Sequence, residues 1–126
     1  MSATIIKTSE APAPIGPYNQ AVKANGFLFI SGQIAINPAT NNIDATTVEE
    51  EAEQVMKNLQ AVLAAAGTDF SKVVKTTIFL SDMSLFQTVN EIYGRYFTDN
   101  FPARETVAVL GLPKNVNVEI SMISIV

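Results

Sequence analysis

One long amphipathic segment, residues 48–66, places the strongest constraint on the fold. Its apolar residues follow the three- and four-residue spacing of a helix with one buried face; they are Ala52, Val55, Met56, Leu59, Val62, Leu63 and Ala66. Thr46 and Thr47, each followed three residues on by a glutamate, have the spacing of a capping box, and Gly67 is typical of a helix end. We therefore expect a helix from about Val48 to Ala66.

The segments before this helix have the pattern of strands. Asn25-Gly26 favours the positive φ angles of a two-residue hairpin turn, and it separates strand-like runs at residues 20–23 and 27–32. Ahead of this hairpin, residues 11–17 contain three prolines and a glycine. This composition predicts a stiff, extended loop that fixes the direction of Tyr18.

The segments after the long helix predict a strand, a second helix and two more strands. Residues 73–80 are rich in β-branched side chains, and the aromatic stripe that follows them repeats at helical spacing. Residues 104–110 and 116–123 flank a turn, so we expect them to pair as a hairpin. A symmetric register would place Thr106 opposite Glu119.

This order of elements predicts an α+β fold, with two helices packed on one face of a mostly antiparallel sheet. The 126 residues fit one domain, residues 1–126. Strand residues predicted on the other face, Val74, Ile78, Ile123 and Ile125, would leave more apolar surface than a soluble monomer exposes. We therefore expect a homo-oligomer that buries this face, with any pocket at its edge formed by two chains.

Composition narrows the chemistry that the chain can perform. It has no cysteine and no histidine, which removes Ser-His-Asp and Cys-His nucleophiles and the usual zinc ligands, so no metal site is expected. The net charge is -4 and the lysines are scattered singly, so nucleic acid is a poor default partner. No apolar run of about 18 residues and no targeting segment is visible, which indicates the cytoplasm and no membrane.

Arg104 is the residue that most strongly suggests a binding site. The only other arginine, Arg95, falls in a helical pattern where a solvated charge is ordinary, whereas Arg104 stands between a proline turn and an apolar strand. Its planar guanidinium suits a small carboxylate, and Glu119 across the expected hairpin could polarise a water molecule. The spacing fits a plain cross-strand ion pair between Arg104 and Glu119 equally well.

Weaker candidates lie elsewhere. Tyr18 could bind a ligand, although an isolated tyrosine is more often a core residue with a satisfied hydroxyl. Ser31 and Gly32 permit close backbone approach, although a glycine there more often marks a bulge. Asn90 could reach either a ligand or solvent. The glutamates that begin the long helix are expected to be solvated, and the aromatic stripe of the second helix is expected to be core.

Several segments, in order along nearly the whole chain, resemble one known family. They are Ile15-Gly16-Pro17-Tyr18, Phe29-Ile30-Ser31-Gly32-Gln33-Ile34, Val74-Lys75-Thr76-Thr77-Ile78-Phe79-Leu80, Phe101-Pro102-Ala103-Arg104, Leu112-Pro113-Lys114 and Val118-Glu119-Ile120. Together they resemble the RidA family, also called the YjgF or reactive-intermediate deaminase family. The resemblance implies a chorismate-mutase-like α+β fold, a homotrimer, and ligand sites in the clefts between subunits.

The resemblance also implies an activity. Family members act as 2-iminobutanoate/2-iminopropanoate deaminases: without a cofactor, they hydrolyse enamines and imines such as 2-aminoacrylate, released by pyridoxal-phosphate enzymes, to 2-keto acids and ammonia. By position, Arg104 resembles the residue that clamps the substrate carboxylate, and Glu119 resembles the residue that orients the attacking water. Positions that resemble the family's pocket lining are Tyr18, Ser31, Gly32 and Asn90.

Two residues depart from the family pattern, which commonly has a small residue directly after the arginine and often cysteine next. Here these positions hold Glu105 and Thr106. Strand alternation should turn Glu105 away from Arg104, and Thr106 keeps a hydroxyl and a backbone N–H for the ligand. We expect activity to survive with a shifted substrate preference. The alternatives are a non-catalytic 2-keto acid binding or sensing module and an RNA-cleaving translation inhibitor, which the acidic charge and missing histidines disfavour.

Overall fold

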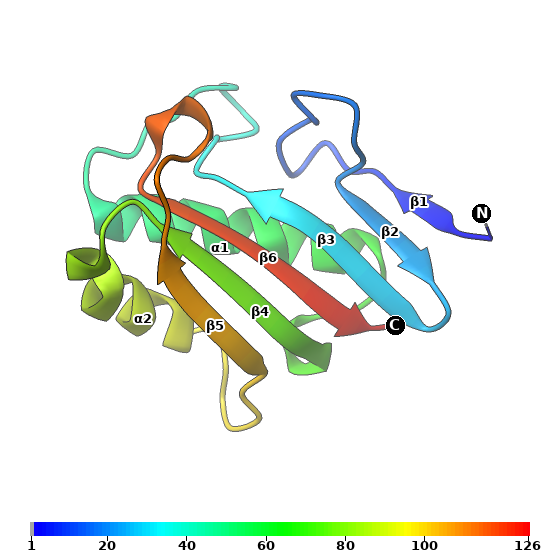
Figure 1. Ribbon diagram of the computed structural model, residues 1–126. Coiled ribbons are helices and arrows are strands. Elements are labelled where there is room, and N and C mark those ends of the chain that lie inside the picture. Colours follow the sequence, from blue (N-terminus) through cyan, green and yellow to red (C-terminus); the bar gives the residue numbers. More distant parts are fainter. Residues whose placement is uncertain (1) are drawn as a thin grey trace.

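The computed structural model describes residues 2–126, which form one six-stranded sheet with two helices on one of its faces (Figure 1). The elements are β1 Thr4–Ile6, β2 Ala21–Ala24, β3 Phe27–Gln33, α1 Val48–Ala65, β4 Val73–Leu80, α2 Phe86–Gly94, β5 Ala103–Ala108 and β6 Val118–Ile125. The strand order is β1-β2-β3-β6-β4-β5, and every neighbouring pair is antiparallel except β4 and β5. The predicted α+β class is confirmed.

The long helix begins at Val48 as predicted and ends at Ala65, one residue before the predicted end. The Thr47 side chain accepts a hydrogen bond from the Glu50 N–H (3.1 Å), and the Glu50 carboxylate accepts one from the Thr46 N–H (2.9 Å). Gly67 has a φ of 80°, the left-handed conformation that ends many helices. The first hairpin is confirmed as well, because Asn25 and Gly26 have φ angles of 55° and 81° between β2 and β3.

The predicted C-terminal hairpin is wrong. β5 pairs in parallel with β4, whereas β6 lies between β3 and β4 and does not touch β5 in the sheet. The α2 crossover returns the chain to the starting end of β4, so β5 must run parallel to β4. Residues 109–117 then cross over the end of β4, as Figure 1 shows. Glu119 is consequently in register with Phe79, not with Thr106.

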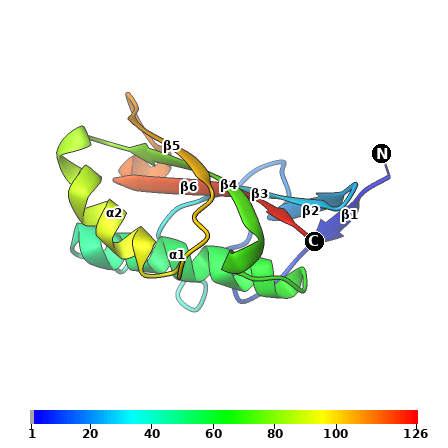
Figure 2. The same cartoon turned by 90° about the horizontal axis from the view of Figure 1, so that it is seen from below.

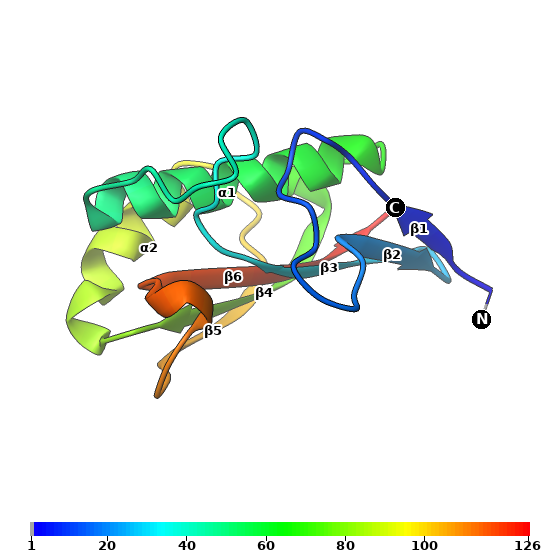
Figure 3. The ribbon, with the colours of Figure 1, turned by 90° about the horizontal axis from the view of Figure 1, so that it is seen from above.

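Both α-helices lie on the same side of the sheet, and within residues 2–126 no α-helix covers the opposite, open face (Figures 2 and 3). Large apolar side chains are exposed on this face at Phe27 and Phe29. Val74 and Ile125 are exposed as well, as the sequence predicts. Ile78 corrects the prediction, because it is only 1% exposed and belongs to the helix-side core. A bulge between Val73 and Lys75 shifts the alternation of β4, so residues after it point to the opposite face from the one expected.

The glutamates at the start of α1 divide into two kinds. Glu49 and Glu50 are exposed, as expected of a solvated helix start. Glu51 is only 6% exposed and accepts hydrogen bonds from the first residues of β6, which corrects the prediction. Neither helix in residues 2–126 combines the length and apolar character needed to cross a lipid bilayer.

Candidate functional site

Arg104 is held by α2. It lies on the helix face of β5, in register with Thr76, and its Nη1 donates a hydrogen bond to Asn90 Oδ1 at 2.7 Å. The guanidinium carbon is 5.7 Å from the centre of the Phe86 ring and 5.2 Å from that of Tyr93. Cations are attracted to aromatic ring faces at this range. We call Phe86, Asn90, Tyr93 and Arg104 the Arg104 cluster. Its other three residues fix the direction of the Arg104 guanidinium.

The cluster borders an open hollow of about 380 Å³, whose lining includes Asn90, Tyr93 and Arg104. The Tyr93 hydroxyl donates to Thr76 Oγ1 at 3.0 Å. Burial raises the pKa of Tyr93 above its ordinary value, against the opposing effects of Thr76 and the Arg104 charge. The Tyr93 hydroxyl stays neutral at physiological pH, so the group behind the Arg104 guanidinium carries no charge. The remaining N–H groups of Arg104 can donate hydrogen bonds to an anion.

Sequence reasoning assigned the aromatic residues of α2 to the core and missed this role. Tyr93 is indeed buried, but Phe86 is 36% exposed beneath the guanidinium. A signal was present in the sequence, because Phe86, Asn90 and Tyr93 are spaced by four and three residues and share one helix face. Asn90 is the polar residue on this aromatic face, and it lies where the face contacts the Arg104 guanidinium.

Glu119 lies on the open face of the sheet, because its neighbours Val118 and Ile120 are fully buried toward the helices. Its carboxylate rests against Gly32 of β3: a Cβ atom placed on Gly32 would stand 2.7 Å from Glu119 Oε2. The register of β3 also shifts between Ile30 and Gln33, which confirms the bulge reading of this glycine. Gly32 therefore makes room for a carboxylate.

The carboxyl group of Glu119 has an unusual environment. Burial raises its pKa above the ordinary value, and no charge or hydrogen bond offsets this effect. Within residues 2–126, Arg104 donates a hydrogen bond to Asn90 and forms no ion pair with Glu119. The prediction of a cross-strand ion pair between them is therefore wrong. A carboxyl with a raised pKa exchanges protons closer to neutral pH and is a candidate general base.

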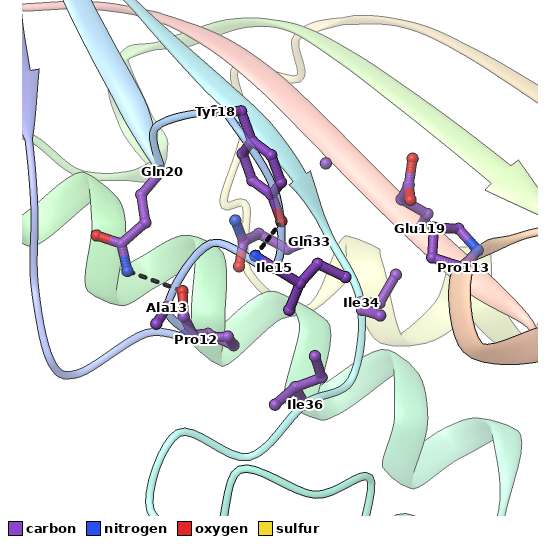
Figure 4. Close-up of a pocket in the computed structure, with 11 residues that line it drawn as sticks. Pro12, Ala13, Ile15, Tyr18, Gln20, Gln33, Ile34, Ile36, Pro113 and Glu119 are labelled. Carbon is purple, nitrogen blue, oxygen red and sulfur yellow. Dashed lines mark hydrogen bonds between the residues drawn. The ribbon is translucent and has the colours of Figure 1, made fainter.

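Tyr18 is 44% exposed, so the core reading of this residue is wrong. Its hydroxyl accepts a hydrogen bond from the Ile15 N–H at 3.2 Å, which leaves the hydroxyl proton free to be donated. Gln20 anchors the proline loop by donating to the carbonyls of Thr8 and Pro12, each at 2.9 Å. This anchoring holds Tyr18 at the mouth of a small pocket (Figure 4).

That pocket has a volume of about 50 Å³ and is lined by residues from four parts of the chain. They include Tyr18 from the proline loop, Pro113 from a short 3-10 helix and Glu119 from β6 (Figure 4). Gly32 of β3 also lines the pocket. We call Tyr18, Gly32 and Glu119 the Glu119 pocket. The structure thus brings three of the predicted site residues together here, and Asn90 and Arg104 together at the other cluster.

The remaining predicted residues have distinct surroundings. Ser31 Oγ donates to the Asn19 carbonyl at 2.6 Å, so its hydroxyl is already engaged. Thr106 Oγ1 is buried without a hydrogen-bond partner among residues 2–126. Glu105 forms an ion pair with Lys75 at 2.9 Å and points away from Arg104, as predicted. Within residues 2–126, no three acidic, histidine or cysteine side chains lie together in a way that could hold a metal ion.

The two clusters face opposite sides of the sheet. Arg104 lies on the helix face beside α2, and Glu119 lies on the open face beside β3. One chain therefore cannot direct both groups at one small ligand. The cation and the carboxylate are therefore arranged separately, each by its own surroundings.

Comparison with known proteins places these features in a family. The family model described as Endoribonuclease L-PSP matches residues 8–126. The chain belongs to the RidA (YjgF) family. As a RidA-family protein it is 54% identical to RutC family protein slr0709 of Synechocystis, an alignment that covers 99% of this chain and 98% of the relative. It is 48% identical to the human 2-iminobutanoate/2-iminopropanoate deaminase, over 96% of this chain and 88% of that protein.

Solved structures agree with the RidA-family fold. The Rid family protein YyfA of Yersinia pestis superposes with a TM-score of 0.96 at 48% identity, covering 99% of this chain and 100% of the other. E. coli TdcF with bound serine superposes with a TM-score of 0.93 at 38% identity, covering 98% of each chain. Relatives of this protein thus include deaminases and a protein that binds a small amino acid.

Proposed function

We propose that this protein hydrolyses 2-iminopropanoate, 2-iminobutanoate and their enamine tautomers, such as 2-aminoacrylate, to 2-keto acids and ammonia. The observation that carries the proposal is Arg104, whose guanidinium is fixed by two ring faces and the Asn90 amide and has no anionic partner among residues 2–126. Its unused donors match a substrate carboxylate. Relatives named as deaminases support the same reading.

We infer that the complete site needs two copies of the chain. Arg104 and Glu119 face opposite sides of the sheet, so a second copy has to supply one of them. The exposed Phe27 and Phe29 on the open face support self-association, because an apolar face of this kind is normally covered. The proposed assembly is a homotrimer in which Arg104 of one copy approaches the Glu119 pocket of the next.

The chemistry follows from these two groups. An enamine takes a proton on its terminal carbon and becomes an iminium ion, whose carboxylate binds Arg104. Water adds to the iminium carbon while its proton passes to the Glu119 carboxylate. The nitrogen of the resulting carbinolamine takes that proton from Glu119. The C–N bond then breaks and ammonia leaves, while the carbinolamine hydroxyl loses a proton and becomes the keto group. The reaction exchanges C=N for C=O without change of oxidation state, so its balance requires no redox cofactor.

The environments of both groups suit this sequence. The raised pKa of Glu119 makes proton transfer to and from the carboxyl easier near neutral pH. The Arg104 cluster contributes orientation, because the guanidinium is already directed before substrate arrives. The free hydroxyl proton of Tyr18 and the unpartnered Thr106 hydroxyl are proposed to bind the remaining polar atoms of the ligand.

The test couples a pyridoxal-phosphate serine or threonine dehydratase to this protein and follows formation of pyruvate or 2-ketobutyrate. The proposal expects acceleration over the spontaneous hydrolysis. No acceleration, together with binding of 2-ketobutyrate measured by calorimetry, would replace it with a sensing module. Cleavage of a single-stranded RNA in place of enamine turnover would support the activity that the family description names.

A further inference from the structure

Glu51 is a buried carboxylate in the first turn of α1. It is only 6% exposed. Its Oε2 accepts hydrogen bonds from the backbone N–H groups of Asn117 (2.7 Å) and Val118 (2.9 Å), and its Oε1 accepts one from the Asn117 side-chain amide (3.0 Å). A buried charge is costly unless donors surround it. Here the donors are the two residues that immediately precede Glu119.

The start of β6 needs this support because β3 does not reach it. The pairing of β3 with β6 ends at Gln33 and Ile120, beyond the bulge in β3. On the other side, the Ser81 N–H donates to the Asn117 carbonyl at 2.9 Å. The backbone before Glu119 is therefore held by β4 on one side and by Glu51 on the side that β3 leaves empty.

We propose that Glu51 is a positioning residue for Glu119: it fixes the backbone of residues 117 and 118 so that the Glu119 carboxylate stays against Gly32. The clearance there is small, because a Cβ on Gly32 would lie within 3.0 Å of three atoms of the Glu119 side chain. A small backbone displacement moves the carboxylate away from the ligand, and catalysis is sensitive to displacements of about 1 Å. The inference rests on the proposed deaminase function.

The chain offers a matched control in the same helical turn. Glu49 is exposed and carries the same charge two residues earlier. Glu51→Gln keeps one carbonyl oxygen for the backbone N–H groups but offers an amide to the Asn117 side chain. Glu51→Ala removes every acceptor. The expected order of damage is therefore Glu51→Ala, then Glu51→Gln, with Glu49→Gln close to wild type.

The kinetic test compares kcat and KM of these variants in the dehydratase-coupled assay. We expect Glu51→Ala to lower kcat by about 10- to 100-fold. KM should change less than about twofold, since Arg104 on β5 still binds the substrate carboxylate. Glu51→Gln should lose less. An unchanged kcat in folded Glu51→Gln and Glu51→Ala would overturn the proposal, and so would an equal loss in Glu49→Gln.

A second readout needs no substrate. The Glu119 carboxyl is titrated by ¹³C NMR in the wild type, Glu51→Gln and Glu49→Gln. Facing it in the Glu119 pocket are Gly32, Pro113 and Tyr18, of which only Tyr18 is titratable among the described lining residues. We expect the titration midpoint to move in Glu51→Gln and to stay in Glu49→Gln. If Glu51→Ala does not fold, Glu51→Gln carries both tests.

The two readouts separate the failure of this inference from failure of the proposed function. A wild-type protein without deaminase activity whose Glu119 midpoint still moves in Glu51→Gln would reject the deaminase function and retain the positioning role. An active wild type whose kcat and midpoint are both unaffected by Glu51→Gln would reject the positioning role and retain the function.

Discussion

The Arg104 cluster and the Glu119 pocket are built in opposite ways. Arg104 is surrounded by partners within its own chain, namely two ring faces and an amide oxygen. Glu119 has no hydrogen-bond or ion-pair partner in residues 2–126, and burial alone raises its pKa. The cation is preorganised and the carboxylate is destabilised as an anion. Under the proposed function, Arg104 is the binding half and Glu119 is the proton-transfer half, and the two form one site only where two copies meet.

The largest effect is expected from removing the binding half. Arg104→Ala should lower kcat/KM by a factor on the order of 100 to 1,000, because a bidentate charged interaction contributes about 3–4 kcal/mol. The thermal midpoint should hardly change, since Arg104 is partly exposed. Arg95→Ala, an exposed arginine just beyond α2, is the control and should keep wild-type kcat/KM. Equal losses in the two variants would mean that net charge, not the cluster, matters.

Gly32→Ala should damage the proton-transfer half without touching the cation. Its new Cβ would stand 2.7 Å from Glu119 Oε2, so the carboxylate has to move. We expect kcat to decrease by a factor on the order of 100, with KM nearly constant. Gly111→Ala, whose Cβ would meet nothing within 4 Å, is the matched control for steady-state kinetics. A raised KM with normal kcat would show that Gly32 serves substrate binding instead.

Tyr93→Phe divides the Arg104 cluster into its ring and its hydroxyl. The ring that faces Arg104 is retained, but Thr76, fully buried, loses its hydrogen-bond partner. We expect the free energy of unfolding to decrease by about 1–3 kcal/mol while KM stays near the wild-type value. Denaturant titration and steady-state kinetics check both parts. A raised KM at unchanged stability would contradict this division.

The smallest expected effect is the pH dependence of stability from Glu119. The folded chain holds this proton more tightly than the unfolded chain, because burial raises the pKa. Its contribution is therefore most favourable below the unfolded glutamate pKa of about 4.3 and is lost as the pH rises through the raised value. Glu119→Gln should abolish this decrease in the free energy of unfolding, because glutamine does not titrate. Denaturant titrations at pH 4 and pH 7 are compared in an Arg104→Ala background, so that no second copy adds a guanidinium.

Carboxyls elsewhere provide a check on the sign. Hydrogen bonds from Thr46, Ser71 and Ser84 lower the pKa values of Glu50, Asp69 and Asp82. These groups add stability as the pH rises. They are the same in Arg104→Ala and in Arg104→Ala with Glu119→Gln, so their contributions cancel in the comparison. A pH dependence that Glu119→Gln leaves unchanged would contradict the assigned role of burial.

Local signals in the sequence were sufficient for most of the elements. The capping box at Thr47 and the Asn25-Gly26 turn act through bonds between near neighbours, so their sequence spacing determines their geometry. The order of strands depends on distant segments instead. Nothing in residues 104–123 indicates that β4 lies between β5 and β6, and the bulge after Val73 reverses the alternation that spacing alone predicts.

The same distinction applies to the candidate site. Arg104 and Glu119 could be selected because each is a charge in an apolar setting. Their separation onto two faces, the exposure of Tyr18 and the burial of Glu51 follow from sheet topology and could not be read from spacing. Resemblance to a family supplied roles for these residues, whereas the structure supplied the faces on which they lie.

The most direct test of the central claim uses two damaged chains. Arg104→Ala and Glu119→Gln are co-expressed with different affinity tags, and oligomers that carry both tags are purified and assayed for enamine hydrolysis. If the two residues act from different copies, one of the three interfaces in each mixed trimer contains both wild-type groups, and about a third of the wild-type activity returns. Mixed oligomers as inactive as either variant alone would contradict the claim that two copies complete the site.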